Sequence, residues 1–228
     1  MSTKLWKIKG LIETLINSPK FNRFILNSFL TKIAKENCFF IEIGANDGVE
    51  GDPLYKFVKK YQLSGIYVEP QKKVFDKLVN NLKEFKNVHF ENIAVSKEEG
   101  KIDLFIPKGT EKINDNITSL MASTSIDKGN LRYFGSYEVE QVNSKPFSYL
   151  VDKYNLHEKF NLFLLIDIEG NEKELIESID FSICKPKYIF FEHVHMTYDS
   201  HLNLNNFLTN LGYRIYFSKN DTMASLRS

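Results

Sequence analysis

The sequence has few cysteines, no long apolar run and almost no net charge, and each absence narrows the range of functions. Two cysteines occur in 228 residues, Cys38 and Cys184, without the spacing of a disulfide framework or a zinc motif. We therefore expect buried thiols in a reducing compartment. No apolar run approaches the roughly 20 residues that cross a membrane. Glu13, Asn17 and Pro19 interrupt the N-terminal segment before a signal-peptide core can form, so we expect a soluble, cytoplasmic protein.

Charge is small in total but uneven along the chain. The formal net charge is +1, which gives no reason to expect a nucleic-acid partner. Residues 1–35 nevertheless carry seven lysines and arginines against one glutamate, a local charge of +6, so the remainder is near −5. Apolar residues recur at helical spacing over residues 4–17 and 21–35, with a break at Pro19. These two amphipathic helices either pack on the domain or, through their basic faces and Trp6, contact a glycan-assembly partner or the inner face of an anionic membrane.

Length and composition predict one main domain. With 43% hydrophobic residues the chain can bury one sizeable core, which we place in residues 37–228, with the helices of residues 1–36 as an extension. Residues 108–146 begin with a long polar stretch and form an insertion or lid, because structureless loops of this length in compact domains are usually functional or disordered. The aromatic side chains within residues 133–137 suit the flat faces of sugar rings, although an insertion that never touches substrate fits equally well.

A short apolar stretch followed by a turn, CFFIEIGANDGVEG at residues 38–51, organises the domain. Its β-branched and aromatic residues predict a buried strand, and Gly44 and Gly48 allow the following loop to close around a ligand. Ligands of α/β sheets bind at the carboxyl ends of the strands, where Glu42 also lies. Asn46 stands where a dinucleotide-binding loop has its second glycine, which argues against a nicotinamide or flavin cofactor.

The second and third predicted strands also have polar residues at their carboxyl ends. Asp52 and Pro53 resemble the cap and first turn of a helix over residues 53–61. The next strand ends at Glu69, 27 residues after Glu42, where nucleotide-binding units place an acid that accepts hydrogen bonds from ribose hydroxyls. Residues 88–96 then predict a third strand, which contains Asn92 and Ala94. Residues 101–107 alternate apolar and polar side chains, as an antiparallel edge strand does.

Two later strands end in charged residues. The most hydrophobic run, residues 162–170, predicts a central strand, and period-two alternation places Asp167 and Glu169 on one side of it. The strand over residues 188–195 places His193 and His195 together, opposite in face to Glu192. A single short histidine pair is weak support for a metal site, so we expect none. Helix 203–211 and a hairpin of residues 213–217 and 223–226 complete the chain.

Four of these segments resemble motifs of the FkbM family of class I S-adenosylmethionine-dependent methyltransferases. They are EIGANDG at residues 42–48, VEP at 68–70, the N-x-A-x-S segment at 92–96 and IDIEGNE at 166–172. The family methylates hydroxyls, largely on sugars and related natural products, and the resemblance spans about residues 38–217. It implies S-adenosylmethionine as the cofactor, with Asn92 and Ala94 beside the adenine. The implied cofactor-binding residues are Glu42, Gly44, Ala45, Asn46, Asp47, Glu69, Pro70, Asn92, Ala94 and Asp167.

The order of elements predicts a doubly wound, mostly parallel, seven-stranded Rossmann-like α/β sheet with N-terminal helices and an antiparallel C-terminal hairpin. The expected reaction is methyl transfer to a hydroxyl of a sugar, glycan or related small molecule. Its general base is Asp167, His193 or His195; we favour a histidine, because Asp167 is well placed for the methionine moiety. Two alternatives are a metal-dependent hydrolase that uses the strand-end carboxylates and histidines, and a non-catalytic interaction module that docks through residues 1–35.

Overall fold

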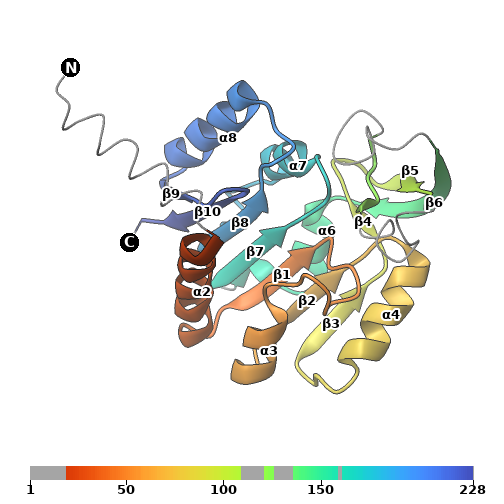
Figure 1. Cartoon of the computed structure of the whole chain (residues 1–228), viewed down its shortest axis with the longest axis horizontal. Helices are drawn as coiled ribbons and strands as arrows, with labels where there is room; N and C mark the ends of the chain where they lie inside the picture. The colour runs from red at the N-terminus through yellow and green to blue at the C-terminus, as the bar shows by residue number, and fades with distance from the viewer. Residues whose placement is uncertain (1–18, 109–120, 126–135, 159–160, 228) are drawn as a thin grey trace.

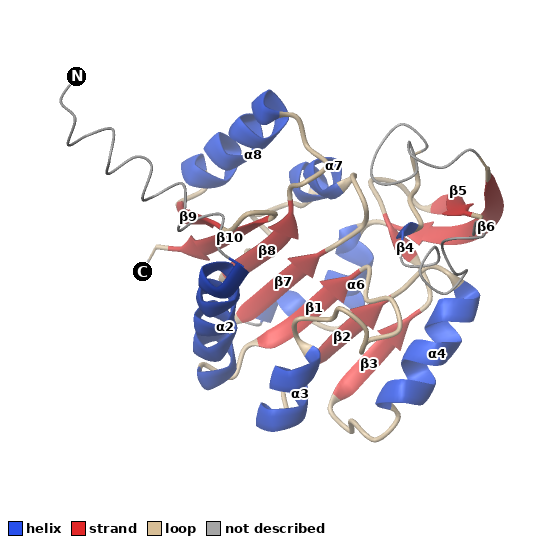
Figure 2. Ribbon diagram, viewed as in Figure 1, coloured by secondary structure: helices blue, strands red, loops and turns tan. Residues whose placement is uncertain are grey.

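A seven-stranded sheet forms the centre of the molecule, seen in the computed structural model in Figures 1 and 2. The structure describes residues 19–108, 121–125, 136–158 and 161–227. The strand order is β3-β2-β1-β7-β8-β10-β9, and the first five run parallel, whereas β10 is antiparallel to both its neighbours. Their bounds are β1 Phe39–Ile43, β2 Gly65–Val68, β3 Val88–Glu91, β7 Leu162–Ile166, β8 Tyr188–Glu192, β9 Tyr213–Phe217 and β10 Asp221–Leu226. The predicted fold class and C-terminal hairpin are confirmed.

Helices cover both faces of this sheet, so successive strand residues are buried on opposite sides (Figure 1). One face is covered by α2 (Pro19–Lys35), α3 (Tyr55–Tyr61) and α4 (Lys72–Leu82). The other is covered by α6 (Phe147–Lys153), the 3₁₀ helix η3 (Leu156–Glu158), α7 (Glu172–Ser178) and α8 (Tyr198–Asn210). In β1, for example, Phe40 packs toward the first set of helices and Ile41 toward the second.

A second, three-stranded sheet lies beyond the carboxyl ends of the large sheet (Figure 1). It has the order β4-β6-β5, with β4 Ala94–Val95, β5 Gly100–Pro107 and β6 Tyr137–Lys145. Ala94, Leu104 and Val142 form its small apolar core. The predicted third strand therefore divides at Asn92: β3 belongs to the large sheet and β4 to the small one. The alternating strand at residues 101–107 is β5, paired antiparallel to β6.

Several predicted boundaries differ from the structure. Helix α3 begins at Tyr55, so Asp52 and Pro53 precede it and do not form its cap and first turn. Helix α8 begins at Tyr198, capped by the Thr197 side chain, five residues before its predicted start. The 108–146 segment contains the nine-residue strand β6.

The N-terminal expectations are only partly within the described residues. The predicted helix of residues 4–17 and the aromatic residues Tyr133 and Phe134 lie outside them. Helix α2 packs on the sheet through Leu30 and Ile33, which are 1% exposed. Along the part of the chain that the structure describes, no helix is both long and apolar enough to cross a membrane.

Gly48 and Gly51 offer a matched test of how the loop after β1 packs on α4. Both have positive φ, but a Cβ at Gly48 would lie 2.5 Å from Leu78 Cδ1 and 2.7 Å from Leu82 Cδ1, whereas none of the described atoms lies within 4 Å at Gly51. Gly51→Ala should lower the free energy of unfolding by about 1–2 kcal/mol through backbone strain. Gly48→Ala should lose about 1–3 kcal/mol more, because Leu78 and Leu82 are fully buried and must repack. Urea unfolding measures both, and equal losses would contradict this packing.

Candidate functional site

The turn after β1 is fixed between the ends of β2 and β7. Gly44 has φ +85°, and a Cβ there would lie 1.7 Å from the carbonyl oxygen of Asp167, so no other residue fits. The N–H groups of Gly44 and Ala45 both donate to the carbonyl of Val68 at 3.0 Å. Asp167 in turn donates its N–H to Ile43 at 2.9 Å. Three strand ends are therefore held together at one point.

Glu69, directly after β2, is held by backbone donors. Its Oε2 accepts the N–H of Asn46 at 3.0 Å and its Oε1 accepts the N–H of Gln71 at 2.8 Å. The side chain is 7% exposed, and burial raises its pKa to about 7, although the two N–H donors favour the ionised form. Each carboxylate oxygen retains acceptor capacity after one such bond. Glu69 can therefore still accept hydrogen bonds from a ligand.

Asn92 and Glu42 lie outside the cavity described below. The amide nitrogen of Asn92 donates to the carbonyls of Glu69 and Pro70, both at 2.9 Å, so this group holds the end of β2. Glu42 is 3% exposed, and burial, followed by the charges of Asp52 and Asp167, raises its pKa well above the usual range. Its Oε2 has no hydrogen-bond partner among the residues that the structure describes. The structure thus gives Asn92 a backbone-holding contact at the end of β2, and its hydrogen bond to adenine stays a prediction.

The turn after β7 is shaped by Glu172. This buried glutamate of α7 folds back and accepts the N–H groups of Ile168 and Gly170 at 3.0 Å. Strand β7 ends at Ile166, and Glu169 has φ +58°. Period-two alternation therefore does not extend to Asp167 and Glu169. The prediction that alternation places these two side chains on one side of the strand is wrong. Glu172 lies in the first turn of α7, where an acid complements the helix dipole. Its role in the turn depends on a buried side-chain direction that local sequence does not encode.

The two histidines after β8 lie in different environments. His193 Nδ1 is 2.9 Å from Thr222 Oγ1, which is itself 2.8 Å from His201 Nε2, and the rings of His193 and His201 stack at 4.1 Å. Burial lowers the pKa of His193 and, with the charge of His193, lowers that of His201 to about 4. The strand ends at Glu192, so His193 and His195 do not share a strand face, contrary to prediction.

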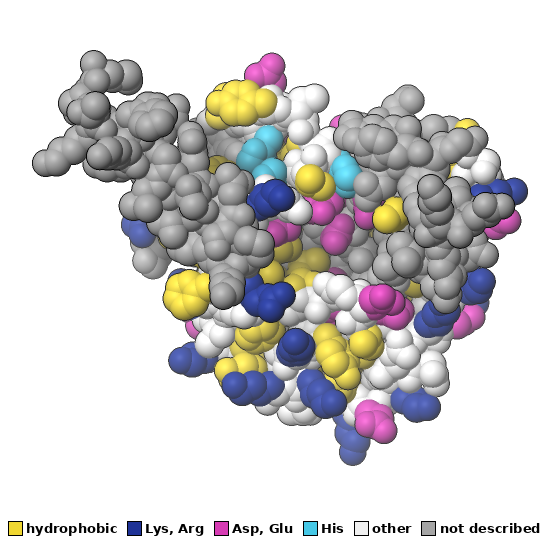
Figure 3. Space-filling model, in the orientation of Figure 1, with side chains coloured by type: hydrophobic (Ala, Val, Ile, Leu, Met, Phe, Trp, Pro, Cys, Tyr) yellow, Lys and Arg dark blue, Asp and Glu magenta, His cyan; other side chains and the backbone are white. Residues whose placement is uncertain are grey.

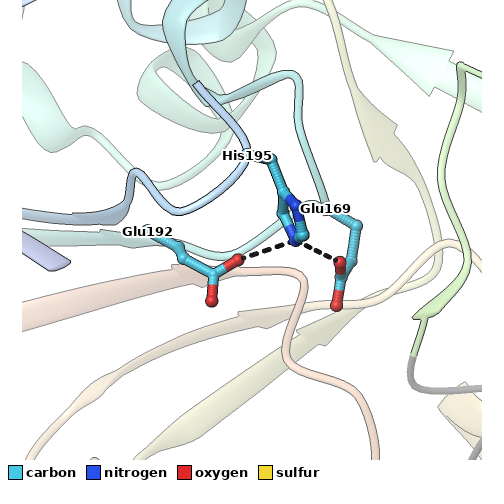
Figure 4. Close-up of side chains that lie close together, drawn as sticks. All are labelled: Glu169, Glu192 and His195. Atoms are coloured by element: carbon cyan, nitrogen blue, oxygen red, sulfur yellow. Dashed lines mark ion pairs between the residues drawn. The ribbon is translucent and has the colours of Figure 1, made fainter. Parts of the chain in front are cut away.

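His195 instead joins Glu169 and Glu192. Its Nε2 is 3.1 Å from Glu169 Oε2 and 3.4 Å from Glu192 Oε2 (Figure 4). We call these three residues the Glu-Glu-His cluster. Acidic side chains and histidines also gather near the middle of the face shown in Figure 3. His193 contacts Thr222 and His201 instead, so the two histidines that the hydrolase alternative uses do not meet in this cluster.

A cavity of about 240 Å³ lies between the carboxyl ends of β1, β2 and β7 and the small sheet. Six predicted residues line it: Gly44, Asn46, Glu69, Pro70, Ala94 and Asp167. Asp167 faces this space, and burial, followed by the charges of Glu172 and Asp221, raises its pKa to about 7. The predicted residues that do not line the cavity are Glu42, Ala45, Asp47, Asn92, His193 and His195.

The wall contributed by the small sheet was not predicted. It includes Ile102 and Leu104 of β5 and the segment Ala122–Thr124. The Ser123 hydroxyl donates to the carbonyl of Glu169 at 2.9 Å, and the Asn171 amide donates to Thr124 Oγ1 at 2.8 Å. The alternation of residues 101–107 indicated an apolar strand face but gave no sign of what that face covers.

Comparisons with known proteins place these features in a family. The model of the methyltransferase FkbM domain matches residues 42–215, and no curated protein matches the chain. The methyltransferase FkbM of Methylobacillus flagellatus KT is similar, with a TM-score of 0.52 and 13% identity over 82% of this chain. This chain covers 43% of that protein.

Two further solved structures are less similar. The magnesium protoporphyrin IX methyltransferase of Synechocystis PCC 6803, with bound S-adenosylmethionine, gives a TM-score of 0.46 and 7% identity over 90% of this chain and 79% of that one. The precorrin-6y C5,15-methyltransferase of Geobacter metallireducens GS-15 gives a TM-score of 0.45 and 14% identity over 93% and 91%. Because the family model matches well over half of its residues, the chain belongs to the FkbM family of S-adenosylmethionine-dependent methyltransferases.

Proposed function

We propose that the chain transfers the methyl group of S-adenosylmethionine to a hydroxyl of a sugar, glycan or related small molecule. The observation that carries this proposal is the cavity at the carboxyl ends of β1, β2 and β7, into which the backbone of Gly44 and the carboxylates of Glu69 and Asp167 converge. Polar groups also line it, among them Ser123, Thr124 and Asn171. Such groups suit an acceptor that carries several hydroxyls.

The residues present fit the cofactor. The left-handed turn at Gly44 keeps side chains out of the cavity floor, and Glu69 retains acceptor capacity for ribose hydroxyls. Ala94 and its neighbours Ile93 and Val95 provide an apolar wall for the adenine. Asp167 faces the cavity and can pair with the amino group of the methionine moiety. The cofactor supplies a methyl group on a sulfonium, which is already a good leaving group, so the protein's task is to position the two substrates.

Removal of the hydroxyl proton falls to the Glu-Glu-His cluster in this proposal. Glu169 lines the cavity and lies 3.1 Å from His195. His193, by contrast, is engaged by Thr222 and His201. Of the three candidate bases, Asp167, His193 and His195, we favour His195, which reaches the cavity through its contact with Glu169, and we assign Asp167 to the cofactor.

Calorimetric titration of the full chain with S-adenosylhomocysteine tests the proposed function directly. Binding of one molecule per chain supports it, and the absence of binding at millimolar ligand would overturn it. The same titration separates the methyltransferase from the alternative of a non-catalytic interaction module.

The Glu69→Ala variant should bind S-adenosylhomocysteine more weakly by about 1.5–3 kcal/mol, the range for loss of hydrogen bonds to a charged group. Glu91→Gln is a matched control, because Glu91 is also a buried carboxylate at a strand end, pairs in register with Val68 and does not line the cavity. Calorimetry on both folded variants makes the comparison. An unchanged dissociation constant in Glu69→Ala would remove Glu69 from the site.

Ligand affinity should rise with pH. Burial raises the pKa of Glu69 and of Asp167 to about 7, so both hold protons in the free protein at about pH 6. Hydroxyl and ammonium donors favour the ionised carboxylates, so binding must release protons. Titrations between about pH 6 and about pH 8, in buffers of different ionisation enthalpy, should show affinity increasing with pH and net proton release. Proton uptake, or constant affinity, would contradict the assignment.

Alanine variants of the two histidines should differ in turnover. His195→Ala should lower turnover by about two to four orders of magnitude, the usual contribution of a general base, and leave affinity for S-adenosylhomocysteine unchanged. His193→Ala should keep most of its turnover. Release of S-adenosylhomocysteine in the presence of a panel of hydroxylated sugars provides the assay. Greater loss in His193→Ala than in His195→Ala would reverse the assignment.

A further inference from the structure

The Glu-Glu-His cluster brings together three potential metal ligands from separate segments. Glu169 lies in the turn after β7, Glu192 ends β8 and His195 lies in the turn after β8 (Figure 4). One ligand atom from each side chain lies within 4.8 Å of the other two. The side chains are only 15%, 22% and 8% exposed. This is a gathered, largely enclosed set of donors, unlike a group of surface acids.

The backbone around the cluster is fixed before any ion arrives. The turn that carries Glu169 is held by the Glu172 carboxylate on one side and by the Ser123 hydroxyl on the other. Glu192 is in register with Asp221 of β10. His193, between Glu192 and His195, donates its N–H to Asn220 at 2.7 Å. Ligands on a rigid framework lose little freedom when they bind a metal, which favours binding.

The surroundings carry an excess of negative charge that a cation would offset. Glu169 and Glu192 each place a carboxylate oxygen within 3.4 Å of the same His195 nitrogen, and Asp221 is in register with Glu192. Like charges so placed repel each other in a region of reduced dielectric constant. A divalent ion bound by Glu169 and Glu192 would lower this repulsion, whereas a single imidazolium at His195 lowers it less.

We propose that Glu169, Glu192 and His195 bind a divalent metal ion at the edge of the cavity. Two carboxylates and one imidazole form an oxygen-rich set with a single nitrogen, which suits Mn²⁺ or a similar first-row ion. Three protein ligands leave coordination positions open, as in catalytic metal sites. This proposal departs from the expectation that no metal binds, which considered only the pair His193 and His195.

The ion has a consequence that rests on the proposed function. Glu169 both lines the cavity and ligates the ion, so an acceptor hydroxyl could occupy an open coordination position. Coordination to a metal lowers the pKa of an oxygen-bound proton and fixes the oxygen in place. His195 would then act as a metal ligand in place of a general base, and the coordinated hydroxyl would lose its proton to water. The turnover defect expected for His195→Ala would remain.

Direct ion binding tests this proposal without reference to turnover. The full chain is treated with a chelator and titrated with Mn²⁺, with calorimetry and electron paramagnetic resonance as readouts. One ion per chain is expected. Even the loss of a group that only hydrogen-bonds to a metal ligand typically lowers affinity about 10–100-fold. Loss of a direct ligand in Glu192→Gln or His195→Ala should therefore weaken Mn²⁺ binding by about 10-fold or more.

Two matched variants control for charge and ring removal. His193→Gln removes the neighbouring imidazole, and Glu174→Gln removes another carboxylate that lines the cavity. Both should bind Mn²⁺ as the unmodified chain does. Without metal, Glu192→Gln should unfold at a temperature close to that of the parent, because the amide has nearly the same shape as the carboxyl group. Its weaker ion binding then cannot be ascribed to misfolding.

The outcomes distinguish the two proposals. Binding of S-adenosylhomocysteine without Mn²⁺ binding overturns the metal site and leaves the methyltransferase proposal intact. Mn²⁺ binding that Glu192→Gln and His195→Ala do not weaken also overturns the metal site, because the ion then lies elsewhere. Mn²⁺ binding that follows the cluster variants, in a chain that binds no S-adenosylhomocysteine, supports the site and removes the proposed function.

Discussion

The close approach of Gly44 to the carbonyl of Asp167 is the constraint on which the candidate site depends. With no room for a Cβ, the β1 turn lies against the end of β7, and its N–H groups reach Val68 at the end of β2. The ends of three parallel strands thereby meet, and the acids that follow them, Glu69 and Asp167, face one cavity. In parallel sheets strand ends generally provide ligand sites, and here a backbone contact determines how near they come.

The same arrangement raises the pKa of two carboxyl groups, at an energetic cost to folding. Burial raises the pKa of Glu69 and Asp167 to about 7, above the values of about 4 expected for the unfolded chain. Between about pH 4 and about pH 7 the folded protein therefore binds more protons than the unfolded chain. The resulting contribution to stability is fully present below about pH 4 and is lost as pH rises through about 7. Near neutral pH these two carboxyl groups therefore lower the free energy of unfolding of the unliganded protein. A ligand that binds their ionised forms raises the free energy of unfolding again.

Sequence alone predicted the large sheet and the strand ends because both depend on local patterns. The apolar runs of residues 39–43 and 162–166 and the glycine turn are visible without tertiary information. The contacts of His193 and Asn92 were not predictable, because a side chain that leaves a strand end is directed by its partners, here Thr222 and the end of β2. Alternation failed at Glu169 for a related reason: once φ becomes positive, the period of the strand no longer applies.

Glu169 belongs to two contacts at once. Its carbonyl accepts the Ser123 hydroxyl from the segment beside the small sheet, and its carboxylate faces His195. A ligand that changes one of these contacts therefore changes the free energy of the other through Glu169. Thermodynamic reciprocity makes the two effects on binding equal in size. We expect an acceptor that touches the small-sheet wall to alter the affinity of the Glu-Glu-His cluster for its own ligand, and that ligand to alter acceptor affinity by the same factor.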